Sequence, residues 1–132
     1  MSAALQKAIV ARLRSDAGVE AIVDDRIYDN VPPDPAFPYL SLGPEQSLPD
    51  RASCGYDGSD ITLQIDAWSR QPGFAEAKRA AEAVRRALID APLELDGHRL
   101  VDIALESIST VRDPDGLTSH AVVTMRALTE PI

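Results

Sequence analysis

Two segments of the chain carry apolar residues at the spacing of an α-helix. The first segment has its apolar stripe at Leu5, Ile9 and Leu13, which predicts a helix over residues 2–14. The second predicts an amphipathic helix over residues 74–90, because apolar positions recur there at alternating intervals of three and four: Phe74, Ala77, Ala81, Val84 and Leu88. Between them, Asp16 is placed to cap a short helical turn that extends to Val23.

Alternation of period two predicts the strands. The clearest case is residues 61–68, where Ile61, Leu63, Ile65 and Ala67 share one face and polar residues or Trp68 share the other. Short β-structure is expected around Ile27 and Tyr28 and over residues 39–42. Residues 44–59 are polar, contain glycines and lack periodicity, so they are expected to form a long loop.

The last third of the chain predicts a hairpin of two long strands, residues 100–111 and 117–129. The turn sequence Asp113-Pro114-Asp115-Gly116 joins them. Within the first strand, Val101, Ile103 and Leu105 are expected on one face. Ile108 falls out of that alternation, which indicates a bulge or a change of face near Ser107. The predicted fold class is α+β, a two-layer sandwich with two or more helices covering one face of a mainly antiparallel sheet.

Charge restricts the partners of a chain of this composition. The 132 residues include 13 Lys and Arg against 21 Asp and Glu, which gives a net charge of -8. Such a domain is a poor candidate for binding nucleic acid, since the affinity of a protein for nucleic acid comes mostly from basic side chains that neutralise phosphates. Residues 16–66 carry eleven acids against Arg26 and Arg51. This asymmetry fits either plain solvation of the surface or charge complementarity between copies of the chain.

Catalytic and metal-binding patterns are weak throughout the sequence. His98 is expected to be a solvated turn residue, and His120 has only Cys54 and Asp66 as candidate partners. Cys54 has no flanking nucleophile motif, and Asp113 with Asp115 fits a turn better than a calcium loop. We therefore expect no enzyme activity, no catalytic residues, no cofactor and no metal. No apolar run is long enough to span a membrane.

Several residues are candidates for contacts with other proteins. Trp68 is interpreted either as a lid on the core or as an interface anchor, and Arg51 and Tyr56 are residue types favoured at contact centres. Arg85 and Arg86 lie on the charged face of the second helix, where Glu82 and Arg86 have the spacing of an ion pair.

The order of short motifs along the chain resembles the tail-completion, or tail-terminator, proteins of long-tailed phages, prophages and gene transfer agents. The resemblance extends from about residue 5 to residue 128. Its motifs are Arg26-Ile27-Tyr28, Phe37-Pro38-Tyr39-Leu40-Ser41-Leu42-Gly43, Ile65-Asp66-Ala67-Trp68-Ser69, Pro72-Gly73-Phe74 and Val111-Arg112-Asp113-Pro114-Asp115-Gly116-Leu117-Thr118-Ser119-His120.

The resemblance implies a structural virion protein that forms one domain over residues 1–132. Members of the family form a homo-hexameric ring that caps the tail tube, contacts the tail-tube protein and joins it to the head-completion, or stopper, protein. The ring would be assembled in the bacterial cytoplasm and lie at the tail–neck junction, with DNA passing through its lumen without specific binding. Two alternatives stay open: another neck or tail component, such as a stopper or minor tail protein, and a small-molecule-binding α+β domain.

Overall fold

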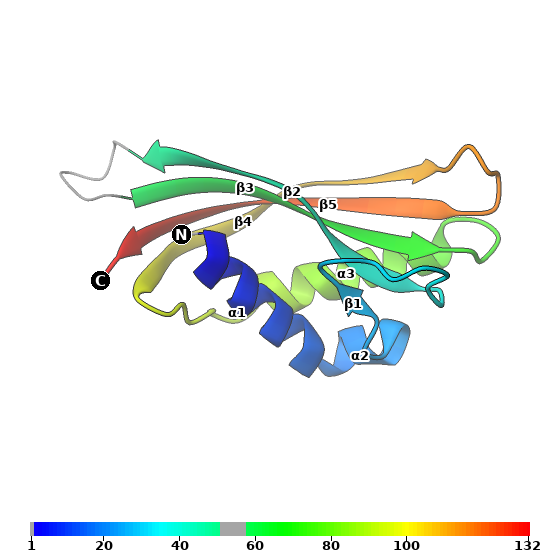
Figure 1. Ribbon diagram of the computed structural model, residues 1–132, viewed down its shortest axis with the longest axis horizontal. Helices are drawn as coiled ribbons and strands as arrows, with labels where there is room; N and C mark the ends of the chain where they lie inside the picture. Colours follow the sequence, from blue (N-terminus) through cyan, green and yellow to red (C-terminus); the bar gives the residue numbers. More distant parts are fainter. Residues whose placement is uncertain (1, 51–57) are drawn as a thin grey trace.

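The protein consists of one sheet with its helices gathered on one side, as Figure 1 shows. The computed structural model describes residues 2–50 and 58–132. The strand order is β1-β2-β3-β5-β4, with β1 parallel to β2 and every other neighbouring pair antiparallel. The predicted α+β sandwich is confirmed. The strands are β1 (Ile27–Tyr28), β2 (Tyr39–Asp50), β3 (Gly58–Ser69), β4 (His98–Arg112) and β5 (Ser119–Pro131).

The helices form where the apolar spacing predicts them. They are α1 (Ser2–Ser15), α2 (Ala17–Val23) and α3 (Ala75–Ile89). The backbone N–H of Val19 donates to Asp16 Oδ2 at 3.0 Å, so Asp16 caps α2 as expected. α3 packs against β3, β5 and β4, whereas α1 contacts α2, α3 and β1.

The hydrophobic core lies between the helices and one face of the sheet. From the helices it takes the predicted stripes, including Leu5, Leu13, Val84 and Leu88, all fully buried. From the sheet it takes alternate residues of the two central strands, so that side chains of one face fill the core and those of the other point away. The buried set on these strands is Ile61, Leu63, Ile65 and Ala67 on β3 and Ala121, Val123, Met125 and Ala127 on β5.

A long loop was predicted over residues 44–59, but both ends of that segment belong to strands, so the prediction is wrong there. β2 continues to Asp50 and β3 begins at Gly58. The strand is irregular because its register shifts between Leu42 and Glu45, where Pro44 lies. Along this part of β2 the described chain has no strand on the side away from β3, and proline is tolerated at such a sheet edge.

The hairpin of β4 and β5 is confirmed, but the expected common face of Val101, Ile103 and Leu105 is wrong. β4 has two register shifts, and the first, between Leu100 and Asp102, leaves Val101 without a partner on β5 and 53% exposed. Ile103 and Leu105 still face the core side, opposite Ala127 and Met125. The second shift, between Leu105 and Ser107, is the predicted bulge, and it brings Ile108 opposite Val123 on the same side.

Candidate functional site

The face of the sheet that bears no helix carries one continuous row of large side chains. Tyr39 on β2 pairs with Trp68 on β3, Trp68 pairs with His120 on β5, and His120 pairs with Val111 on β4. All four lie on the face opposite the core, since their sequence neighbours Leu40, Ala67 and Ala121 are buried in it. We call this surface the helix-free face.

Trp68 is the centre of this row. Its ring stacks on His120 with centroids 3.8 Å apart and planes 9° apart, and it lies 6.2 Å from the ring of Tyr39 at 23°. Its indole N–H donates to Ser41 Oγ at 2.9 Å. The polar group of the tryptophan is therefore satisfied while its ring stays half-buried. Because it lies on the helix-free face, Trp68 is not a lid on the core.

His120 is paired with the buried carboxylate of Asp66, which is one of the two partners that the sequence suggested for it. Its Nε2 lies 2.8 Å from Asp66 Oδ1, and Gln64 donates to the same oxygen at 2.8 Å. The side chains of Asp66 and His120 are 8% and 15% exposed. A Cβ placed on Gly43 would come within 2.8 Å of Asp66 Oδ2 and 3.1 Å of Gln64 Cβ, so any larger residue would have to displace these side chains. The other candidate partner, Cys54, lies outside the described residues.

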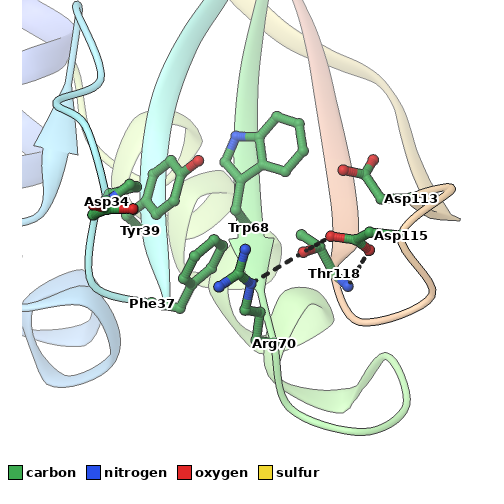
Figure 2. Close-up of a pocket in the computed structure, with 9 residues that line it drawn as sticks. Asp34, Phe37, Tyr39, Trp68, Arg70, Asp113, Asp115 and Thr118 are labelled. Carbon is green, nitrogen blue, oxygen red and sulfur yellow. Dashed lines mark hydrogen bonds between the residues drawn. The ribbon is translucent and has the colours of Figure 1, made fainter.

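A pocket of about 320 Å³ opens beside the aromatic row, at the end of the sheet near the β4–β5 turn. Figure 2 shows Phe37 and Tyr39 on one side of it, Asp113 and Asp115 on the other, and Arg70 between them. The Arg70 guanidinium lies 4.3 Å from the centre of the Phe37 ring, a cation–π distance. The pocket thus combines aromatic rings, carboxylates and one fixed cation.

Hydrogen bonds tie Arg70 to the β4–β5 turn. Arg70 Nε donates to Thr118 Oγ1 at 3.3 Å, and Thr118 Oγ1 donates to Asp115 Oδ2 at 2.8 Å. Burial raises the pKa of the Tyr39 phenol above its usual value, and the nearby Arg70 charge partly opposes that rise. Arg70 carries no signal in the sequence, because an arginine two residues after Trp68 becomes notable only when the fold places it against Phe37.

The turn between β4 and β5 lies where the sequence predicted it, and Asp115 accepts the hydrogen bonds that organise it. Its Oδ1 accepts the backbone N–H groups of Thr118 and Leu117 at 2.9 and 2.8 Å. These bonds, that of Thr118 first, lower the pKa of the Asp115 carboxyl. Across the described residues, no three His, Cys, Asp or Glu side chains gather into a group that could hold a metal ion. His98, which was expected to lie in a turn, is the first residue of β4, with Nδ1 3.1 Å from the Asp96 carbonyl oxygen.

The candidate contact residues are not brought together. Arg85 and Arg86 lie on α3, on the opposite side of the sheet from Trp68, and Arg51 and Tyr56 are outside the described residues. Arg85 donates to both carboxylate oxygens of Glu82, and Arg86 Nε lies 3.4 Å from Glu82 Oε1, the ion pair that the spacing predicted. The Arg85 hydrogen bonds lower the pKa of Glu82. One carboxylate therefore serves both arginines.

Comparisons with known proteins agree with one another. The family model described as "Tail completion protein gp17" matches residues 7–130. The tail completion protein gp17 of Bacillus phage SPP1 is 30% identical over 125 residues, which cover 95% of this chain and 91% of that protein. A chain in the solved virion of a native gene transfer agent particle superposes with a TM-score of 0.89 at 35% identity and covers 98% of this chain and 96% of its own. Within the described residues, no helix is long and apolar enough to cross a membrane.

Proposed function

The chain belongs to the family of tail completion protein gp17, and from that premise we propose that it completes the tail of a phage or gene transfer agent as a hexameric ring. The ring caps the tail tube, stops its growth and presents a surface to the head-completion protein of the neck. The observation that carries the proposal is the match to a chain of a gene transfer agent virion over 98% of this chain. The whole proposed unit is one domain over residues 1–132.

The negative net charge of the chain supports a role as part of a channel through which DNA passes. A ring of six copies, each with a net charge of -8, repels phosphate, so that DNA slides through the lumen and is not held there. The carboxylates of the described chain are mostly exposed rather than paired in the core, which suits a surface that faces water or DNA. We place the ring at the tail–neck junction of the particle.

We propose no catalytic step and no cofactor for this protein. The histidine of the helix-free face is stacked on Trp68 and bonded to Asp66, an arrangement that holds two strands in register. The nearby hydroxyl of Ser41 accepts a hydrogen bond from the Trp68 indole N–H. The groups around the histidine thus bond one another within the sheet. The pocket beside Arg70 is the feature that a small-molecule-binding domain would use, but its fixed guanidinium already lies on Phe37 and bonds Thr118.

Contacts to the other tail proteins are assigned to the predicted residues. Trp68 has the chemistry of an anchor, because its ring is large, rigid and half-exposed beside the pocket. Arg85 and Arg86 would orient neighbouring subunits, since exposed ion pairs contribute only about 0 to 1 kcal/mol each. Arg51 and Tyr56 lie in the segment that joins β2 to β3. They are proposed contacts to a ring neighbour or tail partner.

Tail length measures the proposed function directly. Deleting the gene from the phage or gene transfer agent that encodes it should give tails of uncontrolled length that do not join heads, seen by electron microscopy. The wild-type gene supplied in trans should restore tails of uniform length. Tails of normal length, joined to heads in the deletion strain, would contradict the proposal. Heads that fail to retain their DNA, together with tails of normal length, would favour the alternative that the protein is a stopper.

A charge-reversal variant tests the two arginines of α3. Arg85→Glu together with Arg86→Glu should remain folded by circular dichroism and yet give tails of irregular length. Uniform tails in this variant would remove these arginines from the ring contact and leave them as a solvated helix face.

A further inference from the structure

The two edges of the sheet differ in what they expose. The strand order places β4 at one edge and β1 with the free part of β2 at the other. β4 and the free part of β2 cannot meet within one chain, because β3 and β5 separate them. In the view of Figure 1, α1, α2 and β1 lie in front of α3, which packs against β3, β5 and β4. Each edge therefore belongs to a different side of the molecule.

The β4 edge is long and unpaired, and it exposes apolar side chains between charged ones. It runs for 15 residues, about 50 Å of strand, with open backbone groups along its outer side. It contains no proline and no lysine, although its two bulges and the exposed Asp102 and Glu106 are features that also protect an edge. Of the eight large hydrophobic side chains that the described residues expose, four are on this strand: Val101, Leu105, Ile108 and Val111. Unpaired backbone groups beside exposed apolar side chains are the features through which a sheet edge pairs with another polypeptide.

The helix α3, which packs against β4, carries exposed basic side chains. On the helix, Lys78 projects from the flank opposite Ala87, whose carbonyl oxygen accepts a hydrogen bond from Arg12 of α1. Lys78 is thus turned away from α1. Lys78 and Arg79 are exposed, and no ion pair within the described residues neutralises either of them. At the end of β4 the Arg112 guanidinium lies 4.9 Å from the Phe74 ring centre.

The opposite side of the molecule is acidic. Residues 24–49, which comprise β1, the link to β2 and the free edge of β2, carry five exposed carboxylates against the single half-buried Arg26. Two more of the exposed hydrophobic side chains, Val31 and Leu48, lie in this segment. The five carboxylates belong to Asp24, Asp25, Asp29, Asp34 and Glu45.

We propose that the β4 side of one copy, namely β4 with Lys78 and Arg79, binds the β1–β2 side, residues 24–49, of the next copy. The inference rests on the proposed ring and names its contact. Two unlike surfaces on opposite sides of one chain form a heterologous contact, which closes into a ring when the rotation between copies allows it. Apolar side chains of β4 then meet Val31 and Leu48, and the lysine and arginine of α3 meet the carboxylates. Every open β4 edge is covered in a closed ring.

Site-specific cross-linking in assembled particles tests the pairing. In a Cys54→Ser background, Ser109→Cys on β4 and Gln46→Cys on β2 add two exposed thiols without changing the charge of either side. With a flexible bis-maleimide, the double variant should give a ladder of covalent oligomers that ends at the full ring on a denaturing gel. Each single variant is the matched control and should stay monomeric.

Three results would overturn the proposal and leave the tail-completion function intact. Dimers from Ser109→Cys alone would show that two β4 edges meet each other. Cross-links from Ser109→Cys to the tail-tube protein alone would make that protein the occupant of the edge. Particles with tails of normal length but without a ladder would remove both sides from the ring contact.

A second variant keeps the proposal testable if the cysteine particles fail to form. Val101→Asp together with Val111→Asp should leave circular dichroism and the thermal midpoint close to wild type, because these side chains are 53% and 48% exposed. It should lower the yield of DNA-delivering particles at least tenfold. The control is Leu117→Asp, at a position that is 68% exposed in the turn and away from the β4 edge. Full particle yield from the double variant would contradict the proposed contact.

Discussion

The two faces of the sheet are held in order by different forces. On the helix-covered face, β3 and β5 present only apolar side chains at their centre, and Ile61, Ile65 and Val123 are fully buried. On the helix-free face, the same strands present Asp66, Trp68 and His120, each tied to a named polar or aromatic partner. Apolar burial is non-directional, whereas hydrogen bonds and ring stacking fix particular neighbours.

Because of this difference, the two faces should lose different amounts of folding free energy when a side chain is replaced. The core contributes most of the folding free energy, and volume loss there is felt at once. The helix-free face contributes less per side chain, but a half-satisfied polar network costs more than an apolar surface would. Its side chains also remain within reach of a partner, as the pocket beside Trp68 and Arg70 shows.

The largest effect is expected from shortening a core side chain. Leu88→Ala removes a fully buried side chain where α3 meets the sheet and should lower the free energy of unfolding by about 3 kcal/mol. The matched change on the helix-free face is Val122→Ala, at a half-buried position. It should cost less than about 1 kcal/mol. Urea unfolding followed by circular dichroism measures both, and equal losses would break the comparison between the faces.

Breaking the polar network should have an intermediate effect. His120→Ala leaves the buried Asp66 carboxylate with Gln64 as its remaining side-chain donor and removes the ring stacked on Trp68. We expect a loss of about 2 kcal/mol, less than for a fully stripped buried ion pair because Gln64 stays in place. Tryptophan fluorescence, which reports on Trp68 alone, should change in the same variant.

A conservative variant separates the hydrogen bond from the stacking. His120→Gln can still donate to Asp66 and should recover part of the stability, while the fluorescence of Trp68 stays altered because the stacked ring is missing. If His120→Ala were as stable as wild type, the network would not hold the strands, and the helix-free face would be a plain solvated surface.

Periodicity predicts the elements whose one face is buried. The stripes of α1 and α3 and the alternation of β3 and β5 are read correctly because each has a core side and a polar side. The two sheet edges are where prediction fails. β2 carries Pro44 within an irregular register, and the bulges of β4 change which residues face the core, so that an expected common face fails there.

The candidate site depends on contacts between residues far apart in the chain. His120 and Asp66 are 54 positions apart, and Arg70 and Thr118 are 48 apart. Asp66 could be named as a possible partner of His120, but the sequence does not give the register that aligns Tyr39, Trp68 and His120 across three strands. The local turn at Asp115 needs no such register, and its motif predicted it correctly.

The smallest effect is expected at that turn, as a change in pH dependence. Because the Thr118 and Leu117 N–H groups lower the pKa of Asp115, the folded state favours the charged carboxylate. Its stabilisation is complete above the ordinary pKa of an aspartate and is lost as the pH falls through the lowered value. Asp115→Asn keeps an acceptor oxygen but has no charge, so it should be slightly less stable than wild type at pH 7. The difference should shrink below about pH 4.

Urea midpoints at pH 7, 5 and 3 measure this difference between Asp115→Asn and wild type. Asp113→Asn is the control, since the side chain of Asp113 bonds neither Leu117 nor Thr118. A deficit in Asp115→Asn that stays constant down to pH 3 would show that geometry, and not the charge of Asp115, holds the turn.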